Sequence, residues 1–172
     1  MKKAFTIIEL MVIMTLISVL SAILILSGQS EEKRLAVQRN ALKLVQDIRE
    51  VEEKAMSAEA FNCGGTKIYS YGIFVAAPGD SVAVFADCNG NKTKDIADAI
   101  IKEIKTEKGV VVYQTAPSVL NIVFVPPEPA TFINGFSSGQ EAVITLSSES
   151  NPAEPANWKK VKVNNAGRIE IE

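Results

Sequence analysis

Hydrophobic and polar residues divide the chain into three stretches with different patterns. Residues 5–26 are apolar almost without interruption, and Glu9 is the one charged side chain among these 22 residues. A helix of about 20 apolar residues, each rising about 1.5 Å, spans the hydrocarbon core of a bilayer. We therefore predict a transmembrane helix over residues 5–27. The basic pair Lys2 and Lys3 precedes it, which predicts a cytoplasmic N-terminus.

The second stretch, residues 28–60, has the pattern of an amphipathic helix. Apolar residues recur every three or four positions, and charged residues occupy most of the remaining surface. The recurring apolar positions are Ala41, Leu44, Val45, Ile48, Val51 and Ala55. We predict one continuous helix from about Phe5 to about Ala60, roughly 80 Å long, with its outer half packed on a sheet. Gly28 is a weak point where this helix could bend, because glycine costs about 1 kcal/mol in a helix interior.

The third stretch, residues 61–172, has the pattern of a globular β-rich domain. Short runs rich in β-branched residues alternate with clusters of Gly, Pro, Asn and Ser, as expected of strands and turns. The predicted strands are 67–75, 81–86, 99–104, 110–114, 121–125, 141–146, 159–163 and 168–171, with surface loops at 126–129 and 147–157. The predicted fold class is α+β, with a long N-terminal helix packed on a C-terminal antiparallel β-sheet domain.

Glu9 is the residue that the apolar pattern does not explain. A carboxylate in hydrocarbon costs on the order of 3 kcal/mol unless something pairs with it. Glu9 therefore needs a partner, or it must lie close enough to the cytoplasmic interface to stay hydrated.

Residues 2–10, Lys-Lys-Ala-Phe-Thr-Ile-Ile-Glu-Leu, resemble the type IV prepilin signature. That signature is a basic leader ending in a small residue, then Phe, then an apolar run with Glu at its fifth position. The resemblance implies that residues 1–4 are a leader peptide, that prepilin peptidase cuts between Ala4 and Phe5, and that the new Phe5 amine is methylated. The family usually has glycine where this chain has Ala4. The freed amine of one subunit would neutralise Glu9 of a neighbour.

The resemblance also implies a pilin fold and a structural role in a type IV pilus or a type II secretion pseudopilus. Implied partners are identical or related pilin subunits, the prepilin peptidase, the inner-membrane assembly platform and, before assembly, membrane lipid. The protein would move from the cytoplasmic membrane to a cell-surface pilus or a periplasmic pseudopilus. The alternative is an uncleaved, single-pass, membrane-anchored extracytoplasmic binding domain.

Composition excludes several other functions. The net charge is −2, and loss of Lys2 and Lys3 would make it −4, which weighs against a general nucleic-acid binder. The chain has no histidine, and it lacks a nucleophile elbow and a phosphate-binding glycine loop. We therefore expect a protein that is not an enzyme.

Cys63 and Cys88 both lie in the part predicted to face outward. A disulfide between them would close a loop of about 25 residues and contribute roughly 3 kcal/mol. The alternative is two buried free thiols.

The segment 87–98 places oxygen-bearing side chains at the alternating positions of a calcium-binding loop. The candidate ligands are Asp87, Asn89, Asn91, Thr93, Asp95 and Asp98. Two departures favour instead a strand-to-strand turn built on Asn-Gly-Asn: Lys92 stands where the sharp turn wants glycine, and Asp98 replaces a longer Glu. Residues 85–98 also resemble a segment of GspH/FimT-type minor pseudopilins and pilins. DNA binding, known in some of these, does not carry over, because Arg168 is the one arginine near the C-terminus.

Overall fold

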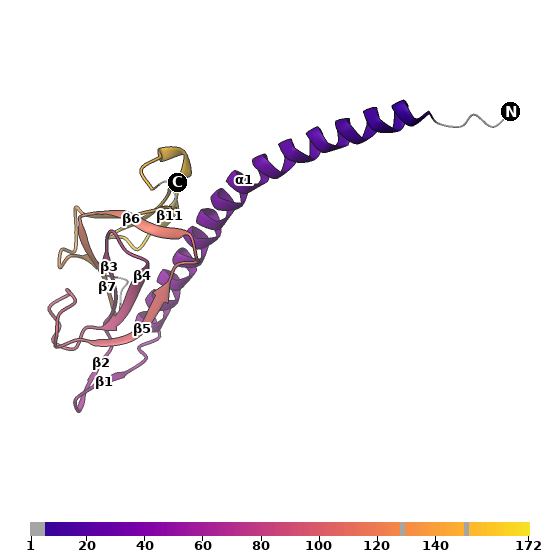
Figure 1. Ribbon diagram of the computed structural model, residues 1–172. Helices are drawn as coiled ribbons and strands as arrows, with labels where there is room; N and C mark the ends of the chain where they lie inside the picture. The colour runs from indigo at the N-terminus through magenta and orange to yellow at the C-terminus, as the bar shows by residue number, and fades with distance from the viewer. Residues whose placement is uncertain (1–5, 128–129, 150–151) are drawn as a thin grey trace.

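The fold is organised around one long helix. The computed structural model describes residues 6–127, 130–149 and 152–172, without the side chains of residues 24–30 and 156. Helix α1 runs without a break from Ile7 to Met56, 50 residues in all, or about 75 Å. Its second half lies along the β domain, whereas its first half projects away from that domain (Figure 1). The predicted helix, 5–60, was therefore slightly too long at its C-terminal end.

The predicted transmembrane segment, residues 5–27, lies in this projecting half, and Phe5 falls outside the described residues. Within the part of the chain that the structure describes, no helix is both long and apolar enough to cross a membrane.

The strands among the described residues pair antiparallel in three sheets. The larger sheets have the orders β5-β4-β3-β7-β8 and β11-β10-β9-β6, and β1 and β2 form a separate hairpin. The strands are β1 Phe61–Cys63, β2 Thr66–Ile68, β3 Tyr71–Ala76, β4 Ser81–Ala86, β5 Ala99–Lys105, β6 Val110–Ala116, β7 Val119–Val125, β8 Ala130–Ile133, β9 Glu141–Ser148, β10 Lys159–Asn164 and β11 Ile169–Ile171, with a short 3₁₀ helix η1 at Pro155–Asn157. The domain is therefore α+β as predicted, with two large sheets.

Several strand predictions needed correction. The single strand predicted over 67–75 is divided into β2 and β3, and strands β1 and β8 were not predicted. The loop predicted to begin at Ser147 begins later, because β9 continues to Ser148, which pairs with Val110 of β6. These differences arise from pairing between distant segments, which local sequence patterns do not record. In the predicted loop 126–129, residues 128–129 lie outside the described residues.

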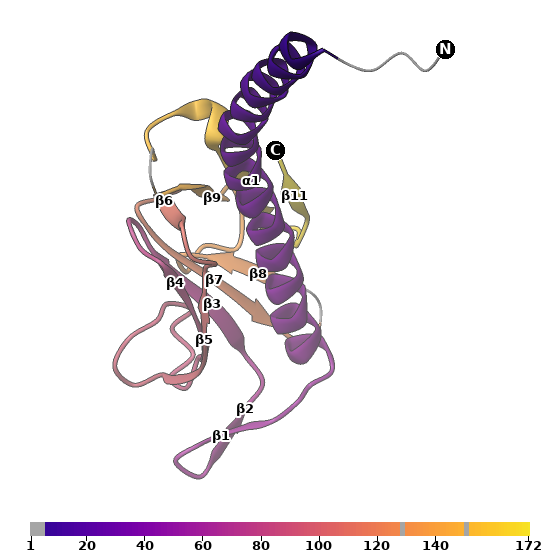
Figure 2. The same ribbon diagram turned by 45° about the vertical axis from the view of Figure 1, so that its right-hand side comes forward.

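The core forms where α1 meets both large sheets. The buried face of the helix carries Val37, Ala41, Leu44, Val45, Ile48, Val51 and Ala55, which includes all six apolar positions of the predicted amphipathic pattern. These side chains pack with Ile73 and Phe124 of one sheet and Ile144 and Leu146 of the other. The helix–sheet contact therefore joins the two sheets into one domain, as the two views show (Figures 1 and 2).

A disulfide ties the small hairpin to the larger sheet. Cys63 at the end of β1 is bonded to Cys88, two residues after β4, with their Cα atoms 5.7 Å apart. Of the two alternatives for the cysteines, the structure thus has the disulfide. Figure 2 shows that the β1–β2 hairpin otherwise extends away from the rest of the domain.

Substitution of a buried residue of α1 should lower the stability of the protein more than substitution of an exposed residue of the same helix. We expect Ile48→Ala to lower the free energy of unfolding by about 2–4 kcal/mol, because Ile48 is fully buried and its removal leaves a cavity. Leu42→Ala is the matched control, since Leu42 is 55% exposed on the same helix. Denaturant unfolding of the full chain in detergent, followed by Trp158 fluorescence, measures both. Equal stabilities of the two variants would contradict the packing described here.

Removal of the disulfide should destabilise the domain through the unfolded state. We expect the double variant Cys63→Ser/Cys88→Ser to lose about 3 kcal/mol, because the closed loop spans 25 residues. The same denaturation experiment measures this loss, with the reduced natural protein as a second arm. A loss below about 1 kcal/mol in both arms would show that the hairpin is held by other contacts.

Candidate functional site

The first turn of α1 is organised around Glu9. Thr6 is the N-cap residue, with extended backbone angles, and its hydroxyl oxygen accepts a hydrogen bond from the Glu9 backbone N–H at 3.3 Å. The Glu9 carboxylate in turn accepts from the Thr6 backbone N–H at 3.4 Å and from the Thr6 hydroxyl at 3.5 Å. This reciprocal arrangement is a capping box, and it places the carboxylate at the positive end of the helix dipole.

The capping box fixes where the helix starts relative to the predicted cleavage site. Ala4 and Phe5, the residues on either side of that site, lie outside the described residues, as does the predicted methylation position at Phe5. Glu9 is described, and its carboxylate is held beside Thr6, the residue that follows Phe5. The signal for this cap was present in the sequence as Thr6 and Glu9 three residues apart.

The projecting half of α1 is an uncovered apolar surface. Every residue from Ile7 to Ile23 is exposed, and Glu9 carries the one charge among them. The large apolar side chains exposed along this segment are Ile7, Ile8, Leu10, Met11, Val12, Ile13, Met14, Leu16, Ile17, Val19, Leu20 and Ile23. Two polar side chains are satisfied within the helix, since Thr15 and Ser18 donate to the carbonyls of Val12 and Met14 at 2.8 Å. An apolar surface of this extent indicates an interaction site.

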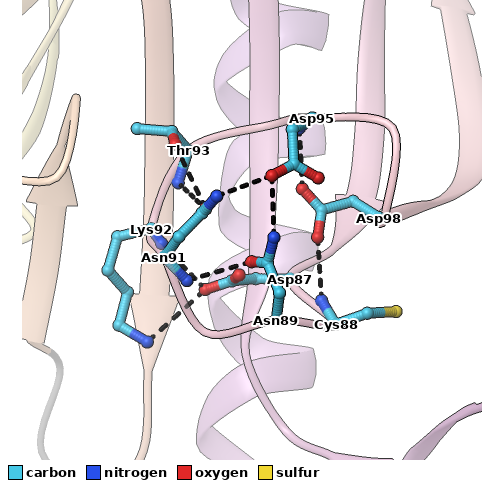
Figure 3. A network of polar contacts seen from close by, with 8 residues as sticks. All are labelled: Asp87, Cys88, Asn89, Asn91, Lys92, Thr93, Asp95 and Asp98. Atoms are coloured by element: carbon cyan, nitrogen blue, oxygen red, sulfur yellow. Dashed lines mark hydrogen bonds and ion pairs between the residues drawn. The ribbon is translucent and has the colours of Figure 1, made fainter.

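The second candidate, the loop 87–98, connects β4 to β5 and encloses its own polar side chains (Figure 3). The amides of Asn89 and Asn91 both donate to Asp95 Oδ2 at 2.7 Å. Asp98 accepts from the backbone N–H groups of Cys88 and Asp95, each at 2.9 Å. Hydrogen bonds therefore join Asn89 and Asn91 to Asp95, whereas Asp98 bonds to the backbone of the loop and Asp87 to Lys92.

Thr93, the sixth predicted ligand, is hydrogen-bonded to Asn91. Its hydroxyl and its backbone N–H both donate to Asn91 Oδ1, at 3.1 and 2.8 Å. The pKa of Asp95 is lowered, first by the hydrogen bond from the Ala97 backbone N–H and then by that from Asn89. Its carboxylate therefore stays ionised at neutral pH and keeps these bonds, which weaken as the pH falls through its pKa.

The hydrogen bonds of the loop are those of the predicted turn, in which Asn and Asp side chains bond backbone groups. Lys92 has a φ of 64°, so the position where the calcium pattern wants glycine does adopt the left-handed conformation. No group of three or more His, Cys, Asp or Glu side chains within the described ranges is arranged to hold a metal ion. Calcium binding stays a prediction.

The sequence pattern did not identify the contact between Lys92 and Asp87. The Lys92 ammonium lies 3.4 Å from Asp87 Oδ2, and the Asp87 side chain is fully buried. In the sequence pattern, Lys92 is only a departure from the calcium-binding loop. Near the C-terminus, Arg168 forms an ion pair with Glu170, so its charge is also balanced within the domain.

Comparison with known protein families matches the N-terminus of the chain. Residues 1–25 match the family described as the prokaryotic N-terminal methylation motif. No curated protein and no solved structure matches the chain. The matched segment contains Thr6, Glu9 and the start of the exposed apolar helix, and the helix-on-sheet architecture is consistent with the pilin fold. The N-terminal motif thus marks the chain as a prepilin similar to type IV pilins and pseudopilins.

Proposed function

We propose that this protein is a structural subunit of a type IV pilus or a type II secretion pseudopilus. In this proposal, prepilin peptidase cuts between Ala4 and Phe5 and methylates the Phe5 amine. The observation that carries the proposal is the projecting half of α1, which joins the N-terminal methylation motif to an uncovered apolar surface with a single carboxylate. The protein acts by assembly rather than by catalysis.

The apolar surface requires a cover both before and after assembly. The motif supports a cytoplasmic-membrane stage, and the basic pair Lys2 and Lys3 favours an N-terminus in the cytoplasm. Lipid then covers residues 7–23. After extraction by an inner-membrane assembly platform, the same side chains are covered by helices of identical or related subunits. Since exposed apolar surface is unfavourable in water, transfer from lipid directly into a filament core avoids its hydration.

Glu9 provides the specific contact of this assembly. Its hydrogen bonds to Thr6 are long, at 3.4 and 3.5 Å, and a carboxylate offers about four acceptor positions. It therefore keeps capacity for a charged donor while it caps its own helix. The freed Phe5 amine of a neighbouring subunit is such a donor, and pairing offsets the cost of burying both charges among apolar helices. The pair would also set the axial position of one subunit against the next.

Processing can be tested on the mature protein. We expect mass spectrometry of the protein from its host to show an N-terminus at Phe5 that carries a methyl group. A strain without prepilin peptidase should yield the chain starting at Met1. If the chain starts at Met1 in both strains, the uncleaved membrane-anchored binding domain becomes the better explanation.

The charge of Glu9 can be separated from its capping role. Glu9→Gln keeps an acceptor that suits a capping box but removes the charge, whereas Glu9→Ala removes both. We expect both variants to reach normal levels in the membrane but to fall at least about tenfold in the sheared filament fraction, since about 1.4 kcal/mol of lost pairing corresponds to a factor of ten. Quantitative immunoblotting of the two fractions measures the effect.

Thr15→Val is the matched control for these variants. It also removes a polar group from the apolar half, but the Thr15 hydroxyl is already satisfied by the Val12 carbonyl. Incorporation of Thr15→Val should stay close to that of the natural protein. Normal incorporation of Glu9→Gln would rule out the charge pairing proposed here.

A further inference from the structure

Asp87 is a buried carboxylate at the base of the 87–98 loop. It follows β4 directly, and its side chain has no exposed surface. Oδ2 accepts from the Lys92 backbone N–H at 3.2 Å and lies 3.4 Å from the Lys92 ammonium. Among the described residues, Oδ1 is buried without a hydrogen-bond partner. A carboxylate removed from water in this way requires a cation nearby.

Lys92 is held in place for this contact by its backbone and its surroundings. Its φ of 64° turns the chain back toward Asp87 in a conformation that disfavours residues other than glycine. Its side chain is 23% exposed, and its ammonium lies 5.8 Å from the centre of the Phe132 ring on β8. Figure 3 shows the Lys92 side chain extending to the Asp87 carboxylate, beside the other polar side chains of the loop.

The remaining carboxylates of the loop are already occupied. Asp95 accepts from Asn89, Asn91 and the Ala97 backbone, and Asp98 accepts from two backbone N–H groups. Loops with oxygen ligands at alternating positions normally gather those oxygens around a divalent cation. Here amide donors serve Asp95 and Asp98, and Asp87 depends on Lys92.

We propose that the ammonium of Lys92 is the built-in cation of this loop. It acts as a tethered counter-ion of Asp87 and closes the connection between β4 and β5 without a bound metal. Removal of its charge leaves the buried Asp87 carboxylate without a counter-ion, and an added hard divalent cation such as Ca²⁺ is then expected to compensate that charge. This inference rests on the geometry of the loop and is independent of the proposed assembly function.

Lys94 provides a matched control in the same loop. Its ammonium also lies over an aromatic ring, 5.4 Å from the centre of Phe74. Within the described residues it forms no ion pair with Asp87, whereas Lys92 does. Substitution of either lysine by methionine removes one positive charge and keeps a similar chain length, so the pair compares the contact with buried Asp87 with the weaker effect of Lys94 on Asp95.

The test is thermal unfolding of the full chain in detergent, with EDTA or with millimolar CaCl₂. In EDTA, Lys92→Met should lower Tm by at least about 5 °C, because it leaves the buried Asp87 carboxylate without its counter-ion. Lys94→Met should lower Tm much less. Calcium should raise the Tm of Lys92→Met and of Lys92→Gly by about 2–4 °C. The natural protein and Lys94→Met should not respond to calcium.

A double variant keeps the test decisive if Lys92→Met folds poorly. Asp87→Asn removes the buried charge, so Asp87→Asn/Lys92→Met should recover most of the Tm lost by Lys92→Met alone. Three results would overturn the proposal: stabilisation of the natural protein by calcium, equal Tm values for Lys92→Met and Lys94→Met in EDTA, or no response to calcium in either Lys92 variant. The first of these would make the unmodified loop a calcium site.

Discussion

The division of apolar surface along a single helix determines the organisation of this protein. The second half of α1 buries one face against two sheets, and that contact joins them into a domain. The first half has no such partner among the described residues, and all of its side chains from Ile7 to Ile23 are exposed. Exposed apolar surface of this extent is unfavourable in water, and the proposed function covers it with lipid and then with other subunits.

Two carboxylates of the described residues differ in whether a positively charged side chain lies beside them. Asp87 is buried within the domain, and its counter-ion is Lys92, five residues further along the chain. Glu9 lies in an apolar segment where the nearest polar group is Thr6, which caps the helix but supplies no positive charge. A buried charge without a counter-ion is unfavourable. The first carboxylate is therefore paired within its own loop, whereas Glu9 has no positively charged partner among the described residues, and the proposed function supplies one from a neighbouring subunit.

The predicted elements succeeded where the local pattern was strong and failed where pairing decided the outcome. The strand predicted at 81–86 has the bounds of β4, and all six apolar positions predicted for the outer helix are buried. The strand predicted over 67–75 is interrupted between Ile68 and Tyr71, because β2 pairs with β1 whereas β3 pairs with β4 and β7. Strand β8 is short and depends on its register with β7.

The sequence alone determined the long two-part helix, the α+β class and the N-terminal signature around Glu9. These depend on residues close together in the chain, where helical periodicity and the order of charged and apolar residues suffice. The tertiary structure decided the two-sheet arrangement, the bond between Cys63 and Cys88, and the contact of Lys92 with a buried Asp87. Each of these requires strand register or burial, which arise only when distant segments pack together.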